Sequence, residues 1–374
     1  MKKATWILSA LTVFLLLEPA RAKDKTTVVD IAGRRVSVVA PVERMILGEG
    51  RHLPAVAIFD RDDPSRRIVG MLGDFKRFDP DGYAQYRAKF PAIDRIPEVG
   101  RVSADSFSVE KTIALKPDVA VFGMTGHGPS AKADTIIAQL AAADIPVVFI
   151  DFRQDPLGNA PKSIAILGRL LGDEKTADAF IAFHAAALKR VDDGLKAVSR
   201  RPTVFLESRV GLSDECCQTM VNGMMGIFVD RTGGDNIAKA MIPGAFGTVG
   251  IEYLLSRQPD VYIGTAVGSL AHATKAPNRI VLGASVPKDV ARASLIRALA
   301  RPGIGGLKAV RDRRAFAVWH HFYNSPFNVA AVQAFAKWLH PAAFADLDPD
   351  RTLATMFERF QPFPAEGTYW IGLE

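Results

Sequence analysis

Two stretches of this chain share one pattern of a helix, a Pro-Asp corner and a buried strand. Residues 109–122 read VEKTIALKPDVAVF, and residues 251–264 read IEYLLSRQPDVYIG. When Val109 is aligned with Ile251, both copies have glutamate at the second position, Pro-Asp at the ninth and tenth, and valine at the eleventh. A repeat of this kind predicts a chain built from two similar units.

Short apolar runs alternate with stretches of helical spacing along most of the chain, which indicates parallel sheets covered by helices on both faces. At 374 residues and 48% hydrophobic composition, the chain is longer than one compact domain usually is, so two domains are expected. The runs that we interpret as buried strands are Arg44–Leu47, Val119–Phe122, Val147–Ile150, Thr203–Leu206, Val261–Ile263 and Phe316–Val318.

A long helical tract separates the third and fourth of these strands. From Glu174 to about Val198, apolar residues recur with a period near 3.6, and Pro202 follows the tract. The sequence therefore predicts an α/β fold of two similar lobes with mainly parallel sheets, joined by a single long helix, with a ligand cleft between the lobes. The expected boundaries are a leader at 1–22, an N-terminal lobe at 23–160, linking helices at 161–200 and a C-terminal lobe at 201–374.

The N-terminus has the features of a secretory signal peptide. Lys2 and Lys3 precede the apolar run 4–17, and the small-x-small pattern Ala20-Arg21-Ala22 places cleavage after Ala22. The alternative is a membrane anchor, but the apolar run is shorter than the ~20 residues that a bilayer requires. The leader contains no cysteine for lipid attachment. An exported, periplasmic protein is expected.

Charge and cysteine content exclude several classes of function. The formal net charge is +7, and the chain stays basic after loss of the leader. No run of five or more Lys or Arg residues stands out, and no aromatic residues are interleaved with basic ones, so no nucleic-acid partner is expected. The charge is compatible with mild steering of an anionic ligand or simply with a well-solvated surface. Cys216 and Cys217 are the only cysteines; they are adjacent and could form a vicinal disulfide in an oxidising compartment.

Several segments together resemble the helical-backbone periplasmic binding proteins of iron-siderophore, haem and cobalamin ABC importers. The segments that carry the resemblance are TTVVDIAGRRVSVVAPVERMI, VGRVSADSFSVEKTIALKPDVAVF, ADIPVVFIDF, the helical tract, TGGDNIA and GTVGIEYLLSRQPDVYIG. The resemblance as a whole covers nearly the whole mature chain. The resemblance implies two rigid lobes that hold the ligand between them and deliver it to a membrane-embedded ABC permease dimer. A monomer without enzymatic activity is expected.

The resemblance also assigns a role to the repeated glutamates. The family's paired docking glutamates lie one per lobe on helices of this kind, and the matching positions are Glu110 and Glu252. The resemblance implies that each glutamate addresses one permease subunit. From residue type alone, a carboxylate favouring its helix N-terminus through the helix dipole would explain both positions equally well.

Ligands of open α/β sheets bind beyond the carboxyl ends of the strands, so the loops there are the candidate lining of the cleft. Four of the seven histidines fall in these loops. Arginine suits the carboxylate or catecholate oxygens of an anionic chelate, and tyrosine could form an aromatic wall. The predicted ligand-binding residues are Arg51, His52, His127, Arg209, His320, His321 and Tyr323.

A ferric siderophore is the favoured ligand, with haem or cobalamin as the alternatives within the same family. No intrinsic cofactor is expected, because the iron would arrive as part of the ligand. His320 and Tyr323 could coordinate iron where the chelator leaves positions open. Residues 48–53 read GEGRHL, which lacks the last glycine of a dinucleotide fingerprint, and the chain has no G-x-S-x-G, H-E-x-x-H or P-loop motif.

Overall fold

The computed structural model describes residues 24–213 and 216–373, so the predicted signal peptide lies outside the described residues. The N-terminal part contains a five-stranded parallel sheet of order β5-β4-β3-β6-β7. These strands are β3 (Met45–Leu47), β4 (Ile68–Leu72), β5 (Glu98–Gly100), β6 (Val119–Gly123) and β7 (Val147–Ile150). An antiparallel hairpin of β1 (Asp24–Val29) and β2 (Arg35–Ala40) precedes them.

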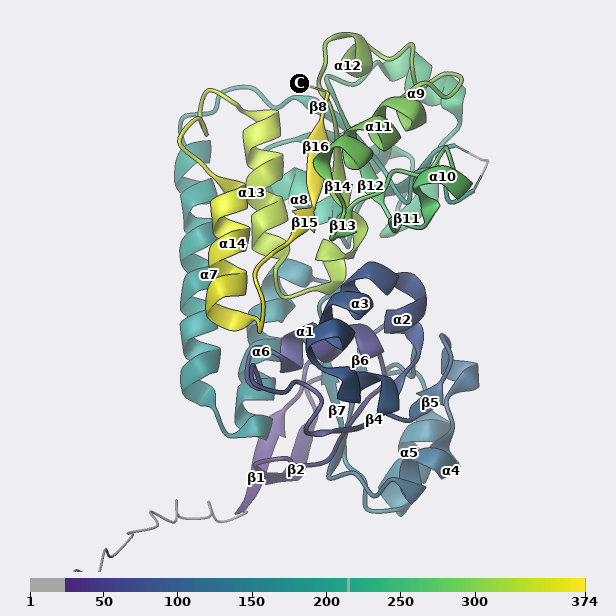
Figure 1. The fold of residues 1–374 in the computed structure, drawn as a ribbon. Coiled ribbons are helices and arrows are strands. Elements are labelled where there is room, and N and C mark those ends of the chain that lie inside the picture. Colours follow the sequence, from purple (N-terminus) through teal and green to yellow (C-terminus); the bar gives the residue numbers. More distant parts are fainter. Residues whose placement is uncertain (1–23, 214–215, 374) are drawn as a thin grey trace, which may run out of the picture.

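Both faces of this sheet are buried, as expected for parallel strands. Val119 and Val121 join the core that includes α6, whereas Ala120 and Phe122 pack towards α4 and α5. Figure 1 shows these elements in the lower half of the molecule. The helices of this part are α1 (Leu53–Val56), α2 (Asp74–Phe78), α3 (Pro80–Lys89), α4 (Val109–Ala114) and α5 (Asp134–Ala142).

The C-terminal part contains a mixed sheet of order β11-β9-β8-β12-β14-β16, with β10 also pairing with β8. Its centre is parallel, because β8, β12 and β14 run in one direction, while β9, β11 and β16 are antiparallel to their neighbours. The strands are β8 (Thr203–Glu207), β9 (Gln218–Met220), β10 (Asp235–Asn236), β11 (Phe246–Thr248), β12 (Val261–Ala266), β14 (Ala315–Trp319) and β16 (Trp370–Gly372).

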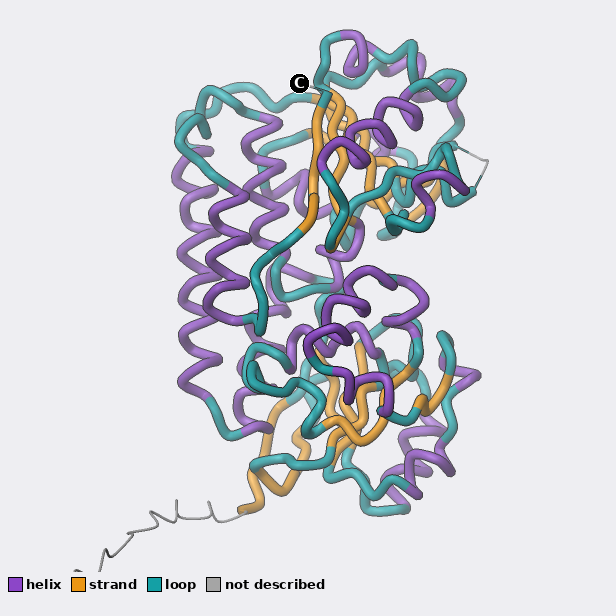
Figure 2. The backbone as a smooth tube through the Cα atoms, viewed as in Figure 1, coloured by secondary structure: helices purple, strands orange, loops and turns teal. Residues whose placement is uncertain are grey.

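Helices cover this second sheet on both faces. They are α8 (Gly226–Arg231), α9 (Ile251–Arg257), α10 (His272–Lys275), α11 (Lys288–Leu299), α12 (Lys308–Arg311), α13 (Asn328–Leu339) and α14 (Pro349–Phe360). A short antiparallel pair of β13 (Gly283–Ala284) and β15 (Gly367–Thr368) lies beside the main sheet. The two sheets form separate groups of strands in Figure 2.

The chain passes from the first sheet to the second through α6 (Pro156–Leu171) and α7 (Glu174–Leu195), which meet at Gly172. Gly172 adopts φ +71°, a left-handed conformation that suits glycine at the end of a helix. The α7 helix runs along one side of the molecule beside both halves and packs against α6 and α13 (Figure 1). It ends at Leu195 rather than near Val198. None of the helices in the described ranges is long and apolar enough to cross a membrane.

The structure confirms the α/β fold of two lobes. All six expected strands are present, at β3, β6, β7, β8, β12 and β14. The sequence reasoning did not identify β1, β2, β4 and β5, nor the short strands β9, β10, β11, β13, β15 and β16. The C-terminal sheet is also more mixed than expected, since three of its strands are antiparallel.

Candidate functional site

A pocket of about 480 Å³ lies where loops of the two lobes meet. The N-terminal lobe lines it with Arg51, Arg77, Phe78, Pro80, His127 and Arg153. The C-terminal lobe contributes Ser208, Arg209, Leu212, Met224, Phe246, Val267, His272, Arg279, His320, His321 and Tyr323. The structure therefore brings together six of the seven residues that the sequence reasoning selected as ligand-binding; His52 is the exception.

The positive charge of this pocket lining comes from its arginines, because burial lowers the pKa of each lining histidine. The lining contains five arginines and four histidines but no aspartate or glutamate among the described residues. The apolar part of the wall comes from Phe78, Leu212, Met224, Phe246 and Val267. A wall that combines arginines with aromatic and aliphatic side chains suits an anionic ligand that also has apolar surface.

Glycines set the local path of the loop after β3. A Cβ on Gly48 would lie 2.3 Å from the ring of Phe122, and a Cβ on Gly50 would lie 2.4 Å from the carbonyl oxygen of Leu72. The loop can therefore pack closely on β4 and β6 only because both positions lack a side chain. Glu49, between the two glycines, is buried.

Arg51 is buried and held by partners on both sides of the pocket. Its Nε donates to Asp74 at 2.9 Å, its Nη2 donates to Glu49, and its Nη1 lies 3.0 Å from Nδ1 of His321. Two carboxylates therefore compensate its charge inside the protein. Arg51, one of the predicted ligand-binding residues, therefore already has its charge paired within the protein.

Glu49 connects the two lobes. One of its carboxylate oxygens accepts from Arg51, from Arg153 at 3.0 Å and from the side-chain amide of Asn324 at 2.6 Å. Burial alone would raise the pKa of Glu49, but the guanidinium groups of Arg51 and Arg153 outweigh burial and hold this pKa well below its usual range. The carboxylate is therefore ionised at neutral pH.

Tyr323 belongs to the short 3₁₀ helix His320–Asn324, which follows β14. Its hydroxyl accepts a 2.8 Å hydrogen bond from Arg153, whose guanidinium also lies 5.0 Å from the centre of the tyrosine ring. Tyr323 is buried and lies close to His320, with ring centroids 4.8 Å apart. Arg153 thus holds the aromatic residue of one lobe from the other lobe.

Hydrogen bonds fix the tautomer of His321. Because Arg51 can only donate, Nδ1 of His321 is the acceptor, and Nε2 then carries the proton and donates to the carbonyl oxygen of Phe78 at 3.1 Å. Burial, followed by the charge of Arg51, lowers the pKa of His321 well below its usual value. His321 is therefore neutral, and neither ring nitrogen is free to bind a metal.

Unlike His321, His320 has a hydrogen-bond partner at only one of its two ring nitrogens among the residues described. Its Nδ1 lies 2.8 Å from the hydroxyl of Thr265, while Nε2 has no hydrogen-bond partner among the residues described. Burial, followed by the charge of His321, lowers the pKa of His320 well below its usual value, so the ring is neutral. The Nε2 of His320 can therefore take a further partner.

His52, the seventh predicted residue, does not line the pocket. This residue lies beside Phe152 in the core beneath the pocket, with ring centroids 5.8 Å apart, and its Nδ1 is buried without a partner in the described chain. Burial lowers the pKa of His52 to about 4. His127, by contrast, lines the pocket and packs on Phe78, with ring centroids 4.5 Å apart. Burial lowers the pKa of His127 to about 4.

Arg209 is held by groups without formal charge. Its Nη2 donates to the side-chain oxygen of Gln218 at 2.9 Å, and its guanidinium lies 5.1 Å from the centre of the Phe246 ring. Its φ of +52° is uncommon for a residue with a side chain. No carboxylate in the described ranges pairs with Arg209 or with Arg279, in contrast to Arg51.

Three buried polar atoms of the lining have no hydrogen-bond partner within the described chain: Nε of Arg153, Oγ of Ser208 and Nε of Arg209. Buried polar atoms are nearly always paired in folded proteins, so each exception calls for an explanation. Their position around one pocket marks it as the place where a polar ligand would be stabilised.

Sequence reasoning missed Arg77, Arg153, His272 and Arg279. Arg77 lies on α2, which follows the unpredicted strand β4; the apolar run IVGML at 68–72 was the available signal. Arg153 lies in the loop after β7, at the end of one of the predicted strands. His272 begins α10 and Arg279 follows that helix, so neither lies directly at the end of β12.

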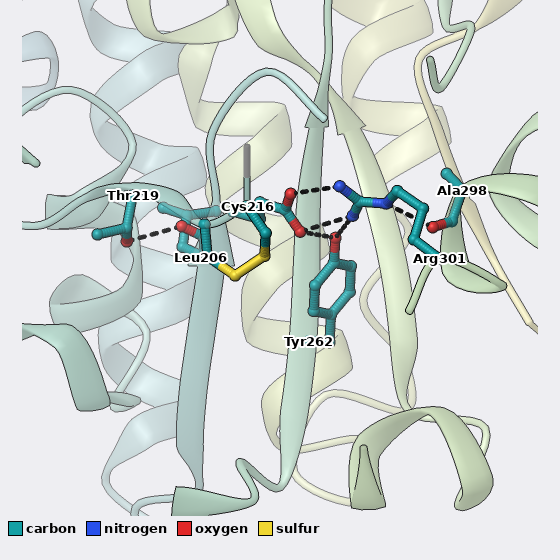
Figure 3. Close-up of a disulfide and its surroundings, with 8 residues drawn as sticks. Leu206, Cys216, Thr219, Tyr262, Ala298 and Arg301 are labelled. Carbon is teal, nitrogen blue, oxygen red and sulfur yellow. Dashed lines mark hydrogen bonds and ion pairs between the residues drawn. A yellow bond between two sulfur atoms is a disulfide. The ribbon is translucent and has the colours of Figure 1, made fainter. Parts of the chain in front are cut away.

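The two cysteines form a vicinal disulfide, as the sequence had allowed. It lies in the segment between β8 and β9, next to Gln218, the partner of Arg209. Behind it, Glu207 accepts two 2.8 Å hydrogen bonds from Arg301 and one from the hydroxyl of Tyr262. Figure 3 shows Tyr262 and Arg301 meeting beside Cys216. A buried charged cluster therefore supports the wall that carries Arg209.

A metal site built only from protein atoms is not evident. Within the described ranges, no three or more His, Cys, Asp or Glu side chains are grouped so that they could hold a metal ion. His320 and Tyr323 are close together, but Tyr323 already accepts from Arg153. These two residues could at most complete the coordination of a metal that brings its own ligands.

The two repeated glutamates occupy equivalent places outside the pocket. Glu110 lies in the first turn of α4 and Glu252 in the first turn of α9, and both are exposed. In Figure 1, α4 and α9 lie in different lobes, and both lie on the side of the molecule away from α7. The arrangement places one outward carboxylate on each lobe.

Comparison with known structures supports the fold. The TroA-like periplasmic binding protein FepB from Veillonella parvula is 26% identical, with a TM-score of 0.82 over 93% of this chain and 99% of that chain. MolA of Haemophilus influenzae, solved with molybdate, is 18% identical with a TM-score of 0.68 over 91% of this chain and 99% of that chain. The heme-binding protein RhuT from Roseiflexus sp. RS-1 is 18% identical with a TM-score of 0.56 over 80% of this chain and 99% of that chain.

Sequence comparison gives the family. A curated relative from Bacillus subtilis, the uncharacterized ABC transporter substrate-binding lipoprotein YvrC, is 32% identical over 114 residues, which are 30% of this chain. The match spans only 35% of that relative's length. The sequence profile described as "Periplasmic binding protein" matches residues 76–317, well over half of the chain. The chain therefore belongs to the periplasmic binding protein family.

Proposed function

We propose that this protein captures an anionic iron chelate, a ferric siderophore, in the pocket between its lobes and delivers it to an ABC importer. The observation that carries the proposal is the composition of the pocket wall, with five arginines, four histidines and no carboxylate among its described residues. A volume of about 480 Å³ falls within the range of small-molecule sites and is far larger than a single tetrahedral oxyanion needs.

The proposed contacts follow from the charge balance of the wall. Arg209 and Arg279 have no carboxylate partner in the described chain, so they are the natural contacts for the anionic oxygens of the chelate. Phe78 and Phe246 offer apolar surface to the body of the ligand. His320 and Tyr323 lie where they could complete an iron coordination sphere that the chelator leaves open.

Delivery is proposed to involve the two exposed glutamates. In this proposal the protein acts as an exported periplasmic monomer without enzymatic activity, and Glu110 and Glu252 each meet a basic residue on one subunit of the permease dimer. Reversal of both charges should abolish transport while leaving chelate affinity unchanged. A loss of chelate affinity in that variant would instead place the glutamates in the binding or folding machinery.

The test of the ligand is a fluorescence titration of mature residues 23–374. Trp319 lies next to the pocket, with its ring centroid 5.2 Å from that of His321, so its emission should report binding. The panel contains ferric catecholate, hydroxamate and carboxylate chelates, haemin and cobalamin, with the iron-free chelators as controls. Tight, saturable quenching by one ferric chelate supports the proposal, and silence across the ferric chelates contradicts it.

Haem is the second candidate ligand, and cobalamin is the third. The observation that favours haem is the neutral His320, whose Nε2 is free of partners in the described chain and could serve as an axial ligand. A shift of the Soret band of haemin that is lost in His320→Ala would favour this alternative. Binding of haemin without any such shift would speak against axial ligation by this residue.

A further inference from the structure

Two exposed aliphatic residues lie at equivalent positions of the sequence repeat. Ile113 is 37% exposed and Leu255 is 38% exposed, and they belong to a small set of large apolar side chains on the surface of the described chain. Both occupy the fifth position of the repeat, three residues after Glu110 and Glu252 respectively. The chain therefore repeats an exposed aliphatic residue together with each exposed glutamate.

The geometry of the two helices places each pair on one face. Residues three apart on a helix are neighbours on its surface. The intervening fourth position, Thr112 in one copy and Leu254 in the other, is fully buried and fixes which side of each helix faces the core. The glutamate and the aliphatic residue of each copy consequently point outwards together.

The third position of each copy is directed back onto its own lobe. Lys111 donates a 2.6 Å hydrogen bond to the carbonyl oxygen of Glu98, and Tyr253 donates a 2.7 Å hydrogen bond to the carbonyl oxygen of Ile237. Neither Glu110 nor Glu252 has an ion-pair or hydrogen-bond partner in the described ranges. The outward face of each helix is thus left with one unpaired carboxylate and one aliphatic side chain.

We propose that Ile113 and Leu255 form the apolar half of the contact with the permease. The inference rests on the proposed function and extends it. The partner is a dimer of two equivalent subunits, each of which presents a basic side chain next to an apolar hollow. The match of both charge and apolar surface in the two lobes argues for such a partner, because a twofold-symmetric partner meets the same surface twice.

The apolar contact would contribute docking affinity that persists at high salt, which the charged contact cannot do. Exposed ion pairs are weakened by salt, since the Debye length is only about 8 Å at physiological ionic strength. Burial of an aliphatic side chain does not depend on charge and is little affected by moderate salt. Docking is therefore expected to retain a salt-resistant part that depends on Ile113 and Leu255.

The test measures docking of the full mature protein to the dimeric permease in lipid nanodiscs, at low and at high salt. Ile113→Gln and Leu255→Gln should each weaken docking about tenfold, and the double variant about a hundredfold, from the loss of buried aliphatic surface. The loss should persist at high salt. The conservative double variant Ile113→Val with Leu255→Met should retain most of the affinity.

The matched control removes two exposed aliphatic residues elsewhere. Val29 and Val39 are 54% and 38% exposed on the β1–β2 hairpin, which Figure 1 shows on the opposite side of the N-terminal lobe from α4. Val29→Gln with Val39→Gln should leave docking unchanged. Docking of the Ile113 and Leu255 variants at wild-type affinity would overturn the inference, and so would a loss that is confined to one lobe.

A titration with the ferric chelate panel, run on the same variants, separates the two proposals. If the variants bind the chelate normally but dock more weakly, both the iron-chelate function and the role of Ile113 and Leu255 are supported. Absence of chelate binding by the wild-type protein would refute the iron-chelate function, while the docking measurement would still decide the role of Ile113 and Leu255. Circular dichroism melts of the variants confirm that a loss of docking does not reflect unfolding.

Discussion

Glu49, in the loop after β3 of the N-terminal lobe, accepts a 2.6 Å hydrogen bond from the side-chain amide of Asn324 in the C-terminal lobe. The same carboxylate accepts from Arg51 and Arg153, and these two arginines in turn contact His321 and Tyr323. A single buried charge thus organises the wall of the pocket and the contact between the lobes. The ligand site and the lobe interface share this network.

Replacement of Glu49 by glutamine should destabilise the protein strongly. The change removes the buried charge that compensates Arg51 and Arg153, and breaking a buried ion pair in this way costs about 3 to 5 kcal/mol. Urea unfolding followed by circular dichroism measures the effect. Asp193→Asn, which removes an exposed carboxylate paired with Lys189 and Lys196, is the control and should change little. Equal stability of the two variants would contradict a structural role for Glu49.

The pocket arginines should separate into two groups. Arg209→Ala and Arg279→Ala should each weaken binding of the ferric chelate by ~1 to 3 kcal/mol, since each removes a charged hydrogen bond to the ligand. Arg51→Ala should mainly lower the free energy of unfolding, because it leaves Glu49 and Asp74 buried without their partner. Calorimetric titration and urea unfolding of all three variants measure the two effects. An affinity loss in Arg51→Ala without a stability loss would show that Arg51 binds the ligand and is not mainly structural.

His52 should contribute to acid sensitivity. Burial lowers its pKa from 6.5 to about 4, so between these pH values the unfolded chain binds a proton that the folded chain does not. The free energy of unfolding therefore falls as the pH falls through this window, by up to about 1.4 kcal/mol per pH unit from this group. Below pH 4, His52 is protonated in both the folded and the unfolded state, so this group no longer changes the free energy of unfolding as the pH falls further.

The variant His52→Gln isolates this contribution. Its stability relative to the wild type at pH 7, where the histidine is neutral in the folded state, measures the packing cost of the substitution. On moving from pH 7 to pH 5, the free energy of unfolding should fall less in the variant than in the wild type. Parallel falls in the two proteins would show that His52 is not the responsible group.

Much of the fold could be predicted because its signals are local. The strands β3, β6, β7, β8, β12 and β14 are short apolar runs buried on both faces, and each stands out in the sequence. The short strands β9, β10, β11, β13 and β15 consist of two or three residues whose pairing depends on distant neighbours, so the local sequence carries no comparable signal.

The position of the candidate site could be predicted from the sequence, but the pairing of its buried charges could not. The ends of the parallel strands indicated the loops that hold Arg209, His320 and Tyr323. The sequence did not show that Glu49 and Asp74 are buried against Arg51, because such pairing arises only from tertiary packing. The sequence likewise did not show that His52 is buried beside Phe152 and does not line the pocket.

The lobes should not move far when ligand binds. A continuous apolar core includes residues of both sheets together with α6, α7, α13 and α14. Within it, the side chain of Asn328 on α13 donates to the carbonyl oxygen of Pro156 at 2.7 Å and lies 2.8 Å from Nε2 of His184 on α7. These buried contacts fasten both linking helices to the C-terminal lobe.

Small-angle scattering of the mature protein with and without the ferric chelate tests this rigidity, and the two profiles should nearly superimpose. Asn328→Val should leave the partners on Pro156 and His184 unsatisfied and should lower the free energy of unfolding by about 1 to 3 kcal/mol for each group left unpaired. If the variant instead keeps wild-type stability, or if the wild-type profile changes markedly with ligand, the fastening of α6 and α7 to α13 does not hold the lobes in place.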